Sequence, residues 1–69
     1  MTQCEQILAY MKAMGGITAR QAMNDIGCMR LASRIHDLRA MGYNIKSEYI
    51  KVRTRNGHTT VVRYSLDAN

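Results

Sequence analysis

The sequence has no proline, no tryptophan and no phenylalanine, and it has only two cysteines. It also lacks a long apolar run, whereas a membrane-spanning helix needs about 20 consecutive apolar residues. The first residues, Met1 to Glu5, contain neither a basic segment nor a small-residue cleavage site. We therefore expect no membrane span, no signal peptide and a cytoplasmic location.

The two cysteines, Cys4 and Cys28, do not form a Cys-x-x-Cys pair and have no histidine or carboxylate at ligand spacing. A disulfide framework or a zinc site is therefore not expected, and both residues are predicted to be small buried hydrophobes. The five carboxylates show no obvious pairing, and no serine or cysteine has a histidine at a workable spacing. The sequence predicts no enzyme activity, no metal and no cofactor.

Basic residues are plentiful and unevenly placed. The formal net charge is +5, and eight of the ten basic residues fall between positions 30 and 63, against two acids, Asp37 and Glu48. A solubilising surface charge would be spread around the fold, whereas this concentration favours a polyanionic partner. The eight residues are Arg30, Arg34, Arg39, Lys46, Lys51, Arg53, Arg55 and Arg63.

The N-terminal third predicts two helices within one domain of 69 residues. Thr2 and Glu5 have the spacing of a capping box, and an apolar stripe from Cys4 to Met14 predicts a helix over about residues 3–14. A second capping box, Thr18 with Gln21, opens a helix over about residues 19–26. The intervening Ile17 is expected to form a short bridge to a sheet. Core positions are also assigned to four methionines, Met11, Met14, Met23 and Met41.

Residues 29–41 predict a third helix, which Gly42 ends. Leu31, Ile35 and Leu38 recur at helical spacing and define its buried stripe. The opposite face carries hydrogen-bonding groups, with Arg34 on one flank and Arg39, expected to be structural, on the other. The outward residues are Met29, Arg30, Ser33, His36 and Asp37.

The remainder, over about residues 45–66, predicts two strands joined at Asn56-Gly57. A bulge near residues 47–49 would explain why Ile45 and Ile50 are out of phase. A two-residue loop pairing Arg55 with His58 would mix apolar and polar faces. We therefore expect a three-residue loop that sets Ile50 opposite Val62 and Val52 opposite Thr60. This register places three cations on the exposed face of the hairpin, namely Lys51, Arg53 and Arg63. Arg55 then lies at the tip.

Three helices followed by a basic hairpin predict an α+β fold, a winged helix-turn-helix. A helix fits the DNA major groove, where arginine can pair with guanine, while lysine and arginine neutralise the phosphates alongside. The predicted base-contacting residues are Arg30, Ser33, Arg34 and Asp37. The predicted backbone-contacting residues are Thr18, Lys51, Arg53, Arg55 and Arg63. Asp37 has two open interpretations, an ion pair with Arg34 or a contact to a cytosine amino group.

The stretch from Gly27 to Ile45 resembles the recognition helix and first wing strand of small stand-alone winged-helix proteins, many of them encoded by bacteriophages and prophages. The portion from Arg34 to Ile45 also resembles, more loosely, biotin-repressor-type regulators. The resemblance implies DNA binding through the third helix and the wing, carried by Arg30, Ser33, Arg34, Lys51, Arg53 and Arg55. One departure is Met29, which stands where a capping serine or threonine is common.

At the level of sequence two functions are the main candidates, and a nonspecific architectural or RNA-binding role is a third. The first is a transcriptional regulator that binds double-stranded DNA, for which a homodimer on symmetric half-sites would multiply specificity. The second is a protein-interaction module that binds an acidic host protein or a nucleoprotein complex through the same basic surface. Tyr49, on the exposed face of the wing, is a candidate donor to the DNA backbone.

Overall fold

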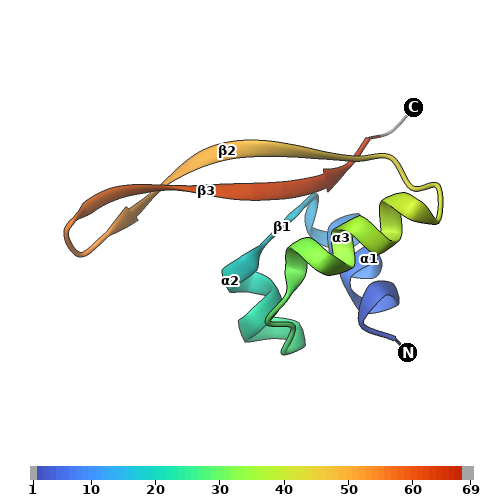
Figure 1. Cartoon of the computed structure of the whole chain (residues 1–69). Helices are drawn as coiled ribbons and strands as arrows, with labels where there is room; N and C mark the ends of the chain where they lie inside the picture. Colours follow the sequence, from blue (N-terminus) through green and yellow to red (C-terminus); the bar gives the residue numbers. More distant parts are fainter. Residues whose placement is uncertain (1, 68–69) are drawn as a thin grey trace.

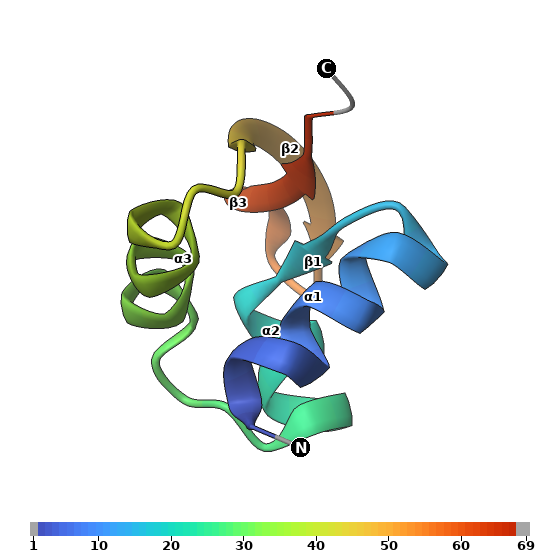
Figure 2. The same ribbon diagram turned by 90° about the vertical axis from the view of Figure 1, so that its right-hand side faces the viewer.

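The computed structural model describes residues 2–67, which form a small helical layer beneath one end of a long hairpin (Figure 1). The three-stranded antiparallel sheet has the order β1-β3-β2. Its base lies over the helices, and its far end extends beyond them (Figures 1 and 2). This is the predicted α+β architecture. The elements are α1 (Gln3–Met14), β1 (Ile17–Thr18), α2 (Ala19–Gln21), η1 (Ala22–Ile26), α3 (Leu31–Ala40), β2 (Ile45–Thr54) and β3 (Gly57–Leu66).

Both predicted capping boxes are present. The Glu5 N–H donates to Thr2 Oγ1 at 3.2 Å, and the Thr2 N–H donates to Glu5 Oε1 at 3.3 Å. At the start of α2, the Gln21 and Thr18 N–H groups donate to each other's side chains at 3.3 and 3.0 Å. Each box gives partners to N–H groups that a helix N-terminus otherwise leaves unpaired. The predicted starts of these two helices are therefore confirmed.

The second helical segment changes its winding partway along. Only Ala19–Gln21 is α-helical, and Ala22–Ile26 forms a wider π-helical turn that ends at Gly27, with φ of +80°. The Tyr10 hydroxyl donates to Asp25 Oδ2 at 2.7 Å, joining α1 to this turn. That hydrogen bond is the largest cause of a raised pKa at Tyr10. The predicted helical segment over residues 19–26 is therefore confirmed in its extent, and its second part is wound as a π-helix.

The third helix begins later than expected. Its N-cap is Arg30, and among residues 2–67 no side chain caps its first turn. Met29, which precedes the cap, is 84% exposed. Because neither residue has a side-chain oxygen to accept from the first helical N–H groups, the helix starts only at Leu31.

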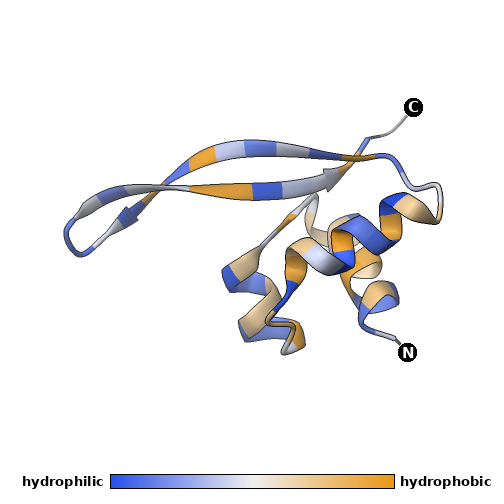
Figure 3. Ribbon diagram, viewed as in Figure 1, coloured by the Kyte–Doolittle hydropathy of each residue, from blue (hydrophilic) through white to orange (hydrophobic). Residues whose placement is uncertain are grey.

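The core is a single cluster of apolar side chains between the helices and the base of the sheet. Figure 3 shows the apolar positions along the helices and at the base of the sheet. Three predicted members are wrong: Met14, Met23 and Met41 are 62%, 50% and 63% exposed, because these short helices bury only one stripe each. Cys4 is half-buried, Cys28 is buried, and both are free thiols. The buried cluster is Ile7, Met11, Ile17, Ala22, Cys28, Leu31, Ile35, Leu38 and Ile45.

The pairing register of the wing is neither the one in which Arg55 pairs with His58 nor the one given by a three-residue loop. β2 and β3 pair from Ile45↔Leu66 to Thr54↔Gly57 in one unbroken series, so the connection is the two residues Arg55-Asn56. Gly57 has φ of +126°, and Thr54 Oγ1 donates to the Gly57 carbonyl at 3.2 Å, which fixes this turn. The predicted three-residue loop and the predicted bulge are therefore wrong.

Strand twist, and not a bulge, accounts for the phase change between Ile45 and Ile50. The two residues lie on opposite faces of the ladder, since side chains alternate along a strand. Two-stranded ribbons twist strongly, and the hairpin in Figure 1 turns about its own axis along its length. Farther out, the twist turns the face that bears Val52 and Val61 toward the helices, where both residues line a groove.

Candidate nucleic-acid interface

An open groove of about 800 Å³ separates the wing from the starts of α2 and α3. It forms because β1 leaves the sheet after Thr18, and the chain turns into α2 while β3 continues outward. The apolar surface of the groove comes from the middle of the wing and from Leu31 and Ala32 of α3. Four arginines from three separate segments also line it: Arg20, Arg30, Arg53 and Arg55.

The outward face of α3 lies beside this groove. Ser33 and His36 are exposed and lie on the side opposite the buried stripe. Ala32 lines the groove, whereas Arg34, two residues later, lies about 200° farther round the helix. Arg34 therefore belongs to the flank of α3 that faces away from the wing.

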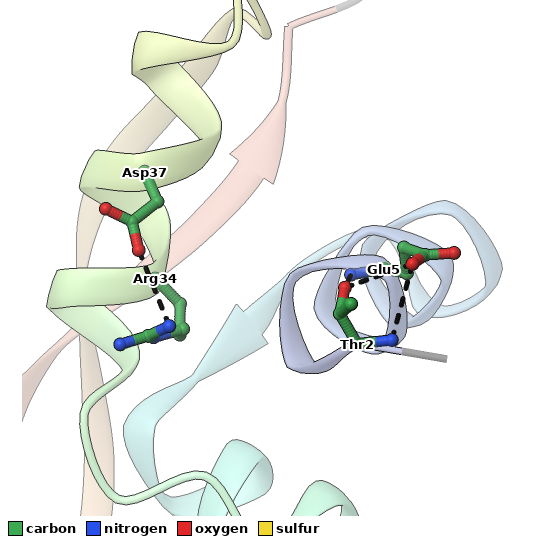
Figure 4. A network of polar contacts seen from close by, with 4 residues as sticks. All are labelled: Thr2, Glu5, Arg34 and Asp37. Carbon is green, nitrogen blue, oxygen red and sulfur yellow. Dashed lines mark hydrogen bonds and ion pairs between the residues drawn. The ribbon is translucent and has the colours of Figure 1, made fainter.

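Arg34 and Asp37 form an ion pair in this structure, with Nη1 and Oδ2 3.5 Å apart (Figure 4). Both side chains are substantially exposed, at 38% and 46%. A surface pair of this kind contributes under about 1 kcal/mol. The structure therefore shows the first of the two interpretations of Asp37, in an interaction that breaks at little cost.

Arg39 connects the helix to the base of the wing. Its Nε and Nη2 donate to the Ile45 carbonyl at 3.1 and 2.8 Å, and its guanidinium lies 6.0 Å from the centre of the Tyr64 ring. The hydrogen bonds hold the first residue of β2 against α3, and the ring contact joins α3 to β3. The structural assignment of Arg39 is confirmed.

The cations of the outer wing lie farther along the hairpin than the Arg39 contacts and are exposed to solvent. Lys51 and Arg53 lie on the same face of β2, opposite Thr60 and His58, and both are exposed. Arg55 is in the turn at the tip. Throughout residues 2–67, the Arg34–Asp37 contact is the only ion pair, so these cations have no acidic partner there. Unpaired exposed cations on an extended arm are suited to a polyanion.

Arg63 does not belong to that cationic face. The register places it opposite Glu48, on the other side of the ladder from Lys51 and Arg53. Its side chain is half-buried over Gly15 and Gly16, and Nη2 lies 3.5 Å from the Met14 carbonyl at the end of α1. The predicted grouping of three exposed wing cations was therefore wrong, and Arg63 connects the sheet to α1.

The structure thus brings together Thr18, Arg30, Arg53 and Arg55 around the groove, while Ser33, Arg34 and Asp37 follow the free side of α3. Arg20 was missed by the sequence interpretation, although its place just after the capping Thr18 puts it at the same opening.

Within the described part of the chain, no three His, Cys, Asp or Glu residues gather as a metal site, and no helix has the length and apolar character needed to span a membrane.

Comparison with known families fits this geometry. Residues 2–69 match the family model described as the winged helix-turn-helix domain. The chain belongs to this family. α3 then occupies the place of the recognition helix, and the β2–β3 hairpin is the wing, an arrangement that suggests DNA as the partner. No curated protein and no solved structure matches the chain significantly.

Proposed function

We propose that this winged helix-turn-helix protein is a transcriptional regulator that places α3 in the major groove of double-stranded DNA and holds the adjacent phosphates with its wing. The observation that carries the proposal is the meeting of Arg30 with Arg53 and Arg55 around one opening, beside the exposed face of α3. These residues come from distant parts of the sequence, and within residues 2–67 no carboxylate forms an ion pair with them. Their summed field favours a polyanion.

The two elements have different tasks in this proposal. On α3, Arg30 and Ser33 contact base edges, and Arg34 reaches a guanine after leaving Asp37, whose carboxylate can then accept from a cytosine amino group. On the wing, Lys51, Arg53 and Arg55 contact phosphates, which fixes position without reading sequence. Thr18 has a smaller part, because its hydroxyl already accepts from the Gln21 N–H.

Selection of bound duplexes from a random pool, followed by affinity measurements, tests this function. We expect one enriched sequence, and a palindromic one would indicate two copies on symmetric half-sites. Arg30→Ala should then abolish the preference for that sequence over a random duplex. Lys12→Ala removes an equal charge from the exposed side of α1 and should leave the preference unchanged. Absence of duplex binding at low salt would refute the proposal.

A further inference from the structure

We infer that the groove between the wing and the helices is a docking site for an extended acidic peptide segment, which adds as a strand to the open edge of β3. This goes beyond the proposed DNA function, although the two ligands share Arg30, Arg53 and Arg55. The inference rests on three properties of the groove: an unpaired strand edge, an apolar floor and a rim of one charge.

The strand edge is open because β1 is very short. β1 pairs with β3 only at Ile17↔Tyr64 and Thr18↔Arg63, after which the chain turns away into α2. From Gly57 to Val62, β3 is paired with β2 on one side, and the described residues place no strand on its other side. Such an edge presents unpaired N–H and C=O groups that a peptide strand can use. The open stretch is about 20 Å long, at about 3.3 Å per residue.

The floor of the groove is apolar. Val52 and Val61, which share one face of the wing, are half-buried and line it together with the buried Leu31. Figure 3 shows this apolar part in the middle of both wing strands. A phosphate group gains nothing from valine methyl groups, whereas every second side chain of an added strand could cover them. The floor therefore favours a peptide over the DNA backbone.

The rim selects the charge of that peptide. Arg20 and Arg30 lie on the helical side and Arg53 and Arg55 on the wing side, and of the described residues that line the groove none is acidic. Arg53 lies on the face of the ladder opposite Val52 and Val61, so glutamate or aspartate at the alternate positions of the added strand would point to the Arg53 side. Arginine pairs readily with carboxylates there. The occupant is thus an extended segment in which acidic residues alternate with apolar or β-branched ones.

Amide chemical-shift titration of the ¹⁵N-labelled full chain tests the inference. The probe is a capped synthetic octapeptide in which glutamate alternates with valine and threonine. We expect saturable shifts at residues 57–62 and at Arg20 and Arg30. A copy that is N-methylated at every second residue cannot complete the strand pairing and should bind at least tenfold more weakly. Absence of saturation at millimolar peptide, or equal binding of the N-methylated copy, would overturn the inference.

Two variants separate the groove from general electrostatics. Arg53→Glu should weaken peptide binding at least tenfold, whereas Lys46→Glu, an identical charge reversal at the exposed base of the wing, should change it less than twofold. A dispersed amide spectrum of each variant verifies folding. Equal losses in the two variants would contradict a specific groove.

A parallel titration with short duplex DNA distinguishes this inference from the proposed function. Peptide and duplex should compete, because both use Arg30 and Arg53. If Val61 and Val62 respond to the duplex and not to the peptide, the groove belongs to the DNA interface and the inference is wrong. If the peptide binds and the duplex does not, the DNA function fails instead.

Discussion

The helical half of the molecule and its wing differ in what their residues do. All the buried apolar residues except Ile45 come from the segment that precedes the wing. The outer wing, by contrast, has exposed side chains and several of the unpaired cations. Substitutions of the buried residues in the helical half should therefore act on the free energy of unfolding, and substitutions of the cations in the outer wing should act on binding.

The wing depends on its attachment because a two-stranded hairpin is only marginally stable by itself. Ile45, Tyr64 and Leu66 pack its base against the core. Three sets of polar contacts also hold the base: the Arg39 hydrogen bonds to Ile45, the short β1–β3 pairing, and Arg63 over the end of α1. All three lie at the base of the wing. Beyond them, the strand pairing and the Thr54 hydrogen bond to the Gly57 carbonyl hold the arm together.

The largest expected effect on stability is that of Leu38→Ala. Leu38 is 1% exposed in the centre of the core, and such truncations cost about 2–5 kcal/mol. A domain of this size has a net stability of only about 3–5 kcal/mol, so the variant should lose a large part of its stability. Urea or thermal unfolding measures the loss. Met41→Ala, three residues later and 63% exposed, is the control and should change the stability by less than about 0.5 kcal/mol.

Arg39→Gln tests the attachment of the wing. The loss of the hydrogen bonds to the Ile45 carbonyl should cost about 1 kcal/mol, since the guanidinium is partly exposed to water. The DNA affinity of the folded fraction should stay the same. If this variant kept its stability but lost DNA binding, Arg39 would belong to the interface and the division between the two regions would be wrong.

Lys51→Ala and Arg53→Ala are the corresponding changes in the outer wing. Each should weaken binding to all DNA sequences alike and reduce the slope of log K against log salt by about one unit. The free energy of unfolding should change by less than about 0.5 kcal/mol, because neither side chain is buried. A fluorescence-anisotropy titration repeated at several salt concentrations gives the salt slope, and an unfolding curve gives the free energy of unfolding. An unchanged salt slope would remove these residues from the phosphate contacts.

The smallest expected effect on DNA affinity is that of Asp37→Ala. It removes a negative charge from the outward side of α3 and releases Arg34, so affinity for random duplexes should rise a few-fold. Arg34→Ala should lower affinity for the selected sequence more than for random duplexes. Paired anisotropy titrations of both variants provide the comparison. A fall in random-duplex affinity for Asp37→Ala would contradict the proposed role of the ion pair.

The sequence predicted best those features that depend on neighbouring residues. The capping boxes at Thr2 and Thr18 were recognisable because each needs two side chains three positions apart. The start of α3 was placed too early, since Met29 and Arg30 fit the helical pattern but supply no cap. The π-helical turn at Ala22–Ile26 had no sequence signal, and the hydrogen bond that joins it to α1 comes from Tyr10, 15 positions from Asp25.

The wing register could not be obtained from hydrophobic alternation. Alternation sets a register when one face is buried along its length, but most of this hairpin projects beyond the core. Its register follows from the turn at Arg55-Asn56 and from Gly57. The three-residue loop that we predicted shifts the register by one residue and therefore placed Arg63 on the wrong face. Of the candidate site, the cations at Arg30, Arg53 and Arg55 were identified from charge alone, whereas the groove that joins them with Arg20 required the tertiary structure.

The most direct test of the DNA-binding account is the amide chemical-shift map of the full chain with a mixed-sequence duplex at low salt. We predict shifts along the first half of α3 and along residues 51–58 of the wing, with α1 unaffected. Absence of any shift would contradict the account. So would shifts confined to the separate apolar surface where α1 meets the end of α3, which includes Cys4, Leu8, Met41 and Tyr43.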